Sequence, residues 1–160
     1  MRTVSSSVAW ALACALLVLV GCAGGDEEPP PPPPVLTLAQ TTARSFTISI
    51  SGEEPLRALQ AELRYDDGAL EVTQVAAGRD AKRIDRLFAG DPAQAAGRLM
   101  LGITDTRRVL LPTRGELFVI SFLGRDSAER AEVVVERALG IDNQGRRTPL
   151  IAVSGELVLK

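Results

Sequence analysis

The chain has 160 residues, 46% of them hydrophobic, and a formal net charge of -2, which predicts one ordinary globular domain. A net charge this small gives no strong attraction toward nucleic acid or membrane lipid, so we expect no nucleic acid among its partners. The chain has no histidine, which excludes Ser-His-Asp and Cys-His catalysis, and both cysteines (Cys14 and Cys22) lie near the N-terminus, which excludes a disulfide framework further on.

Residues 1–21 have the features of a signal peptide. Arg2 provides a positive charge, and the apolar run from Val8 to Val20 is shorter than the about 20 residues that a spanning helix needs. The run closes on Leu-Val-Gly-Cys at 19–22, which resembles the bacterial lipobox. This resemblance implies that Cys22 becomes the lipid-modified first residue of the mature chain. The alternative is an ordinary secretory signal with a cysteine there by chance.

We therefore expect a palmitate-bearing lipoprotein, held to a membrane of the bacterial cell envelope through Cys22. Each buried methylene contributes about 0.8 kcal/mol, so two or more acyl chains on one residue anchor a protein stably. The next residue is Ala23. In Gram-negative sorting an aspartate at that position favours retention in the inner membrane, so Ala23 favours the outer membrane if the cell is Gram-negative.

Residues 22–34 are predicted to be a tether. Gly24 and Gly25 are flexible, an acidic run follows, and Pro29–Pro34 is a stretch of six prolines. Polyproline II rises about 3.1 Å per residue, so this stretch is a semi-rigid spacer of roughly 19 Å. The alternative is a PxxP ligand for an SH3-type module, but a spacer is the simpler function next to a lipid anchor.

The body of the chain is residues 35–160. Its first part alternates apolar and polar residues as half-buried strands do. In 45–51 the inward residues are Phe46, Ile48 and Ile50. In 59–65 the inward residues are Leu59, Ala61, Leu63 and Tyr65, and the outward residues are Gln60, Glu62 and Arg64. The turn at 66–68 then predicts a central hairpin over 56–75, with Leu70 and Val72 buried. Val75 is out of phase with them, which predicts a bulge or the end of the strand.

The second part predicts further strands at 98–104, 116–123 and 131–139, followed by a turn at 142–145. In 98–104, Leu99, Leu101 and Ile103 are predicted to share one face. A short helix is expected near 80–89, since Ile84, Leu87 and Phe88 recur at helical spacing. One last strand is predicted from the alternation of Ile151, Val153, Leu157 and Leu159. We therefore predict an all-β fold, an antiparallel two-sheet sandwich of about nine strands.

The order of these motifs over 35–160 resembles that of cohesin domains. Leu63-Arg64-Tyr65-Asp66 followed by Leu70-Glu71-Val72 is similar to their strand ending in Tyr-Asp, turn and Leu-x-Val. A strand led by Gly115, the Asp-Asn-x-Gly turn at 142–145 and a terminal Gly-x-Leu-x-Leu from Gly155 follow in the same order. The resemblance implies a jelly-roll β-sandwich of nine strands. It also implies protein binding, which in cellulosomes is to a calcium-loaded dockerin.

The chain departs from dockerin-binding cohesins at one place. Their strand before Tyr-Asp carries an exposed Asn and Asp that contact the dockerin, and an ungapped alignment puts Ala58 and Gln60 at these positions. This departure argues against a dockerin of the cellulosomal type. We expect the partner to be another protein, of the envelope or outside the cell, and we expect no cofactor.

Non-catalytic protein recognition is the function that these observations favour. No G-x-S-x-G, P-loop or G-x-G-x-x-G motif occurs, and neighbouring carboxylates in a turn cannot flank a glycosidic bond, so we expect no enzyme. The turn at 142–145 lacks the EF-hand spacing, so we expect no metal there. The alternative function is that of a carbohydrate-binding module. Such modules need exposed aromatic side chains, and in the mature chain only Phe88 lies outside the predicted strands.

The candidate protein-binding face is the outward side of the strand at 59–65. It comprises Gln60, Glu62 and Arg64, extended by Arg98 and Met100 from a neighbouring strand. Its mixed charges suit a specific, salt-sensitive contact. The alternative for each of these residues is a plain solvated surface. The exposed loop at 105–114 is the next candidate surface.

Overall fold

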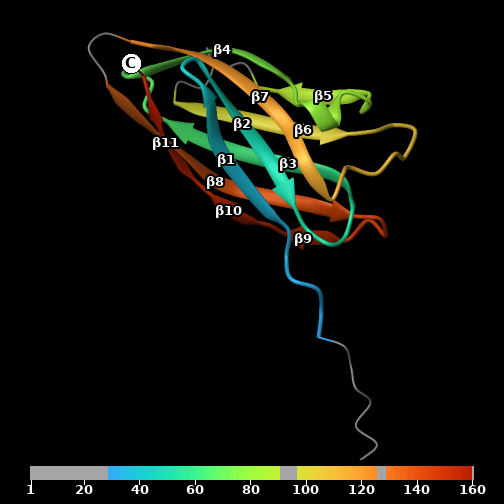
Figure 1. Cartoon of the computed structure of the whole chain (residues 1–160). Helices are drawn as coiled ribbons and strands as arrows, with labels where there is room; N and C mark the ends of the chain where they lie inside the picture. The colour runs from blue at the N-terminus through green and yellow to red at the C-terminus, as the bar shows by residue number, and fades with distance from the viewer. Residues whose placement is uncertain (1–28, 91–96, 126–128, 160) are drawn as a thin grey trace, which may run out of the picture. The chain divides into compact units, whose positions relative to one another are not determined.

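Eleven strands build the part of the chain that the computed structural model describes, residues 29–90, 97–125 and 129–159. They are β1 (Val35–Thr42), β2 (Ser45–Ser51), β3 (Leu56–Tyr65), β4 (Leu70–Ala77), β5 (Arg86–Ala89), β6 (Arg98–Thr104), β7 (Arg114–Gly124), β8 (Arg130–Asp142), β9 (Arg147–Pro149), β10 (Ile151–Val153) and β11 (Gly155–Val158). A five-stranded sheet has the order β10-β1-β2-β7-β4, and a six-stranded sheet has the order β11-β8-β3-β6-β5 with β9 paired to β8 (Figure 1). This confirms the predicted all-β sandwich, with one parallel pair, β1 and β10.

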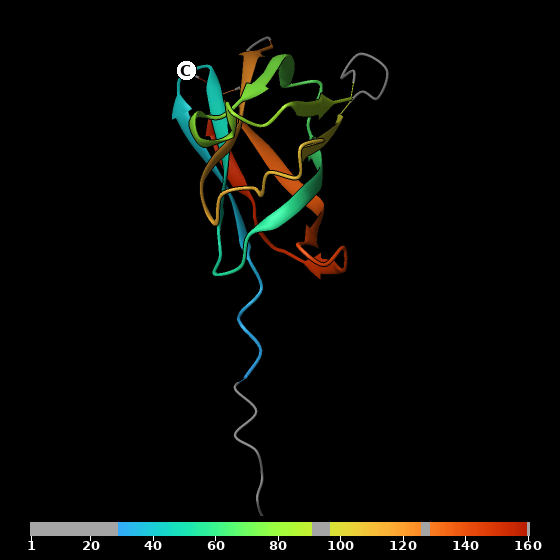
Figure 2. The same cartoon turned by 90° about the vertical axis from the view of Figure 1, so that its right-hand side faces the viewer.

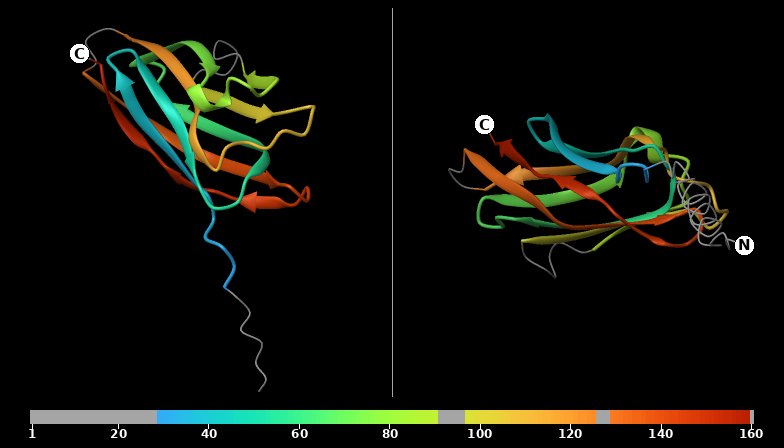
Figure 3. Two further views of the ribbon diagram at one scale, coloured as in Figure 1. Left: turned by 45° about the vertical axis from the view of Figure 1, so that its right-hand side comes forward. Right: turned by 90° about the horizontal axis from the view of Figure 1, so that it is seen from below.

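The core lies between the two sheets, which form two layers in Figure 3. The predicted inward residues of β2, β3 and β6 are all buried: Phe46, Ile48, Ile50, Leu59, Ala61, Leu63, Tyr65, Leu99, Leu101 and Ile103. From β7, Phe122 meets Phe46 with ring centroids 5.9 Å apart. Burying one Leu or Phe side chain contributes about 1.5–3 kcal/mol, so this alternation determines the fold.

The predicted hairpin over 56–75 is wrong, because β3 and β4 belong to different sheets. β3 pairs with β6 and β8, whereas β4 pairs with β7. The turn itself is confirmed, with Gly68 N donating to Asp66 Oδ1 over 2.9 Å. Leu70 and Val72 are buried, and β4 has the predicted bulge, between Val72 and Gln74. The chain therefore crosses from one layer to the other at this turn.

The predicted helix near 80–89 is also wrong. One short 3₁₀ turn covers Arg79–Ala81, and β5 begins at Arg86. β5 pairs with β6, and its residues alternate, with Phe88 outward and Leu87 partly buried. Backbone pairing with a sheet edge outweighs the weak helical spacing of a few apolar residues. In the part of the chain that the structure describes, no helix is long and apolar enough to cross a membrane.

The prediction of one last strand is wrong, because this segment forms two strands, β10 and β11. β10 joins the five-stranded sheet and β11 joins the six-stranded sheet, so the chain changes layer at Ser154. Leu157 is buried, as predicted, but Ile151 and Val153 remain 50% and 46% exposed. The alternation of apolar residues continues through the break, which is why the sequence does not reveal it.

Candidate functional site

The candidate site is the side of the six-stranded sheet that faces away from the core, here called the outer face. The register of β3 and β6 sets its rows, with Glu62 opposite Met100, Arg64 opposite Arg98 and Gln60 opposite Gly102. All five residues of the predicted binding face therefore lie in adjoining rows of one surface. The alternation that buries Leu63 and Leu99 turns these side chains away from the core.

Ion pairs hold one half of the outer face. Arg98 Nη1 lies 3.3 Å from Glu62 Oε1, and Arg64 Nε lies 2.8 Å from Glu136 Oε1 on β8. Exposed pairs of this kind contribute about 0–1 kcal/mol each, so they orient the side chains more than they stabilise the sandwich. This half presents acceptors and donors in fixed places, which suits a polar contact.

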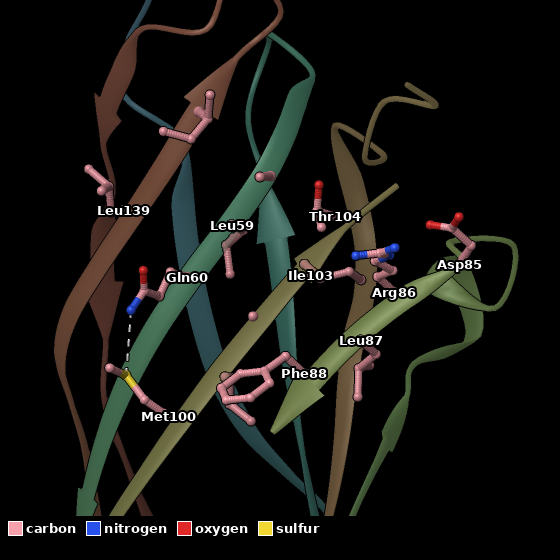
Figure 4. A pocket seen from close by; sticks show the side chains of 14 residues that line it. Leu59, Gln60, Asp85, Arg86, Leu87, Phe88, Met100, Ile103, Thr104 and Leu139 are labelled. Atoms are coloured by element: carbon pink, nitrogen blue, oxygen red, sulfur yellow. Dashed lines mark hydrogen bonds between the residues drawn. The ribbon is translucent and has the colours of Figure 1, made fainter. Parts of the chain in front are cut away.

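An apolar hollow of about 740 Å³ occupies the other half. Phe88 and Met100 stand beside it with 62% and 39% of their surface exposed. Figure 4 shows side chains from neighbouring strands around this hollow, with Gln60 Nε2 directed at Met100 Sδ, 3.6 Å away. Gly102 lines it from β6 and has no side chain to fill it. An exposed aromatic next to a concave apolar surface is typical of a protein or ligand contact.

β8 contributes a part of the hollow that is not predicted from the sequence. Val133 and Val135 are buried, whereas Leu139 and Ile141 line the hollow on the outer face. A register shift against β3 at Glu62 and Leu63 adds one residue to β8 and reverses which alternate positions face inward. Because apolar residues occupy both sets of positions after Val135, no signal in the sequence marks this reversal.

A buried carboxylate fixes the loop that follows β6. The prediction that the loop at 105–114 is exposed is wrong at two positions, because Asp105 is 7% exposed and Leu111 is 1% exposed. Asp105 Oδ1 accepts from Arg107 N over 2.7 Å, and Asp105 Oδ2 lies 2.7 Å from Arg107 Nη2. The side-chain hydrogen bond from Arg107 lowers the pKa of Asp105 to about 2, against the opposing effect of burial. Asp85 holds the same loop by accepting from the backbone N and the hydroxyl of Thr106.

The turn at 142–145 is confirmed. The carboxylate of Asp142 accepts from Gln144 N and Arg146 N over 2.8 Å each, and Arg146 Nε lies 2.7 Å from Asp142 Oδ2. An arginine thus occupies the position that a cation would take. Within residues 29–90, 97–125 and 129–159, no group of three or more His, Cys, Asp and Glu side chains could hold a metal ion. Cys22 and the predicted signal peptide lie outside the described residues.

Comparison with solved structures finds cohesin domains among the neighbours of this chain. The sixth cohesin of scaffoldin B from Acetivibrio cellulolyticus, in complex with a mutant dockerin, superposes with a TM-score of 0.68 and 16% identity, over 81% of this chain and 100% of that one. A type I cohesin–dockerin complex from Clostridium thermocellum gives 0.70 and 12%, over 79% and 99%. A non-cellulosomal cohesin from the archaeon Archaeoglobus fulgidus gives 0.65 and 14%, over 79% and 91%.

These likenesses show that the chain has the cohesin-domain fold, as the order of its motifs predicts. No protein-family description matches the chain, and no curated protein matches it by sequence. The TM-scores establish the fold, but at identities of 16% or less they do not identify the partner.

Proposed function

We propose that this chain, a cohesin-fold sandwich on a lipid anchor, binds a protein partner through its outer face and performs no catalysis. The observation that carries the proposal is the pairing of a fixed charged half with an exposed apolar hollow on one sheet. Interfaces commonly combine a desolvated apolar centre with a polar surround. Phe88 and Met100 are the residues that a partner would cover, and Glu62 and Arg98 would set its orientation.

Solved relatives of this fold support the choice of a protein as the partner. Two of the neighbours were solved in complexes with dockerins. The resemblance in the sequence places such contacts on the sheet that contains β3. Dockerins of the cellulosomal type remain poor candidates here, because the positions of the contacting Asn and Asp hold Ala58 and Gln60. Ala58 has no polar group, and the amide of Gln60 is directed at Met100.

Site-specific photo-crosslinking in the cell tests the proposed face. A photoreactive residue replaces Gln60 on the outer face or, as the matched control, Gln74, an exposed glutamine on β4 of the other sheet. We expect a discrete adduct with one envelope protein from position 60 and no such adduct from position 74. Equal adducts from both positions, or from position 74 alone, would refute the outer face as the contact.

Lipid anchoring is the second part of the proposal, and the lipobox carries it. Cys22→Ala should abolish palmitate labelling and leave the unprocessed precursor, because the modified residue is also the first residue after cleavage. Ala23 favours the outer membrane in a Gram-negative cell. Normal processing and membrane retention of the Cys22→Ala protein would contradict this part without affecting the crosslinking result.

Carbohydrate binding is the competing function, and Phe88 is the observation in its favour. The ring is 62% exposed beside the hollow, in the position of a residue that could stack on a sugar. Phe88 is the one exposed aromatic side chain among the described residues, since Phe46, Phe118, Phe122 and Tyr65 are buried. We therefore expect no retention on cellulose, chitin or peptidoglycan. Retention that Phe88→Ala removes would favour the carbohydrate function over protein recognition.

A further inference from the structure

A loop at one end of the sandwich, Asp105–Thr113, here called the basic loop, is held firmly at both of its ends. At its start, Arg108 N donates to Asp105 O over 3.2 Å, in addition to the contacts of the Asp105 carboxylate. Near its end, Leu111 is 1% exposed, and its N donates to Leu56 O over 2.7 Å. These contacts hold Val109 and Leu110, which lie between them in sequence, at the surface.

The residues between these contacts are apolar and exposed. Val109 is 44% exposed and Leu110 is 39% exposed, and both follow Arg108, whose φ is 64°. A non-glycine residue in this left-handed region costs conformational energy, and the contacts of the basic loop maintain it. The loop therefore presents two adjacent apolar side chains to the outside, although an adjacent leucine is buried.

Several basic side chains near these apolar residues lack a carboxylate partner among the described residues. Five basic side chains near the basic loop form no ion pair within the described part of the chain: Arg57, Lys82, Arg83, Arg108 and Arg114. Three nearby carboxylates are also outside ion pairs: Glu53, Glu54 and Asp85. On the outer face, by contrast, Arg64 and Arg98 are both paired. One more arginine, Arg79, is shared between Asp80 and Glu116, so basic groups near the loop exceed carboxylates by one, whereas the whole chain has a net charge of -2.

The basic loop lies at the end of the sandwich where the proline segment joins β1. Gly52 N donates to Thr113 O over 2.8 Å, and Ile151 N donates to Pro34 O over 3.0 Å. Gly52 packs on Pro34 so closely that an added Cβ would lie 2.9 Å from Pro34 Cβ. Figure 2 shows the proline segment leaving this end and the chain's C-terminal label at the opposite end. The tether therefore joins the sandwich at the same end as the basic loop.

We propose that the basic loop contacts an anionic phospholipid surface, with Val109 and Leu110 among the headgroups and the arginines near the phosphates. The inference rests on the lipid anchor proposed above. The twelve residues between Cys22 and β1 span at most about 40 Å, so the sandwich stays close to the bilayer. A short tether gives an effective concentration on the order of millimolar, at which a weak contact is populated. Each basic side chain near an anionic surface adds about fivefold to the contact equilibrium.

Fluorescence quenching in vesicles tests this contact on the full lipidated chain. A fluorophore is attached at Leu110→Cys or, as the matched control, at Leu123→Cys, which is similarly exposed (45%) on β7. The chain is reconstituted into phosphatidylcholine vesicles, with or without phosphatidylglycerol, that contain a quencher bound to lipid. We expect strong quenching at position 110 in the anionic vesicles, less in phosphatidylcholine alone or at high salt, and little at position 123 throughout.

Charge reversal completes the test. Arg108→Glu with Arg114→Glu should lower the contact equilibrium at least about 30-fold, because two basic groups are removed, while the melting temperature stays nearly unchanged. Quenching at position 110 no stronger than at position 123, or unaffected by the reversal, would overturn the proposal. A chain without lipid on Cys22 would give a distinct pair of results. The chain would then not float with the vesicles at high salt, and Cys22 would accept the fluorophore.

Discussion

The two faces of the six-stranded sheet are built from the same strands but carry different kinds of side chain. The inner face of β3 is uniformly apolar and fully covered, whereas its outer face holds an amide, a carboxylate and a guanidinium whose partners lie on β6 and β8. Residues one position apart therefore differ in function. The inner residues determine whether the sandwich folds, and the outer residues are those that we propose to contact a partner. Four predictions test this division, in order of decreasing expected effect.

Leu63→Ala should give the largest effect. Leu63 is fully buried between the sheets, and truncation of such a side chain removes apolar contacts and leaves a cavity. We expect the free energy of unfolding to fall by about 2–5 kcal/mol, measured by urea denaturation of residues 35–160. This domain should also be soluble and rich in β-structure by circular dichroism. A loss near that of a surface substitution would mean that the assignment of the two faces is wrong.

Low pH should lower the stability of the sandwich through Asp105, a carboxylate at an inward position just after β6. Asp105 continues the inward alternation of Leu101 and Ile103, and Arg107 holds its pKa at about 2, below the ordinary 3.8. Its contribution to stability is therefore complete above about pH 4 and is lost as the pH falls toward 2. We expect urea midpoints to drop over this range, and to drop less in Asp105→Asn. Equal pH dependence of the two proteins would contradict this assignment.

Gly102→Leu should separate binding from folding on the outer face. A Cβ at Gly102 would meet Phe88 at 3.7 Å, an ordinary contact, so the backbone there tolerates a side chain, and a leucine would occupy part of the hollow that Gly102 lines. We expect loss of the adduct from position 60, with stability changed by about 0.5 kcal/mol or less. Charge reversal of Glu62→Arg with Arg64→Glu should likewise eliminate the adduct. Full crosslinking in both variants would exclude the hollow and the charged half as the contact.

Glu62→Ala should give the smallest effect on stability. Its carboxylate pairs with Arg98 at 3.3 Å on an exposed surface, where such a pair contributes little. We expect a cost of about 0.5 kcal/mol or less by the same urea measurement. A cost as large as that of Leu63→Ala would erase the distinction between the faces.

Local alternation explains how much of the fold the sequence could predict. It identified the buried residues of β2, β3 and β6 correctly, because one buried face imposes a period of two. It could not tell that β3 and β4 leave their shared turn into different layers, since a strand looks the same whichever sheet it joins. The polar half of the candidate site followed from the alternation in β3 and β6. The hollow depends on the bulge in β8 and on β5, where pairing partners far along the chain decide which side chains face outward.

One contact between the two ends of the sandwich domain has a consequence for its synthesis. The side-chain amide of Gln40 donates to Val158 O over 2.7 Å and accepts from Val158 N over 2.8 Å, and these residues are 118 positions apart. β1 pairs with β2 next to it in sequence, but its other neighbour in the sheet, β10, exists only after nearly the whole chain has been made. Pairings this distant form slowly, since the intervening chain must close first. The two sheets are therefore complete only once the C-terminal strands β10 and β11 have been made.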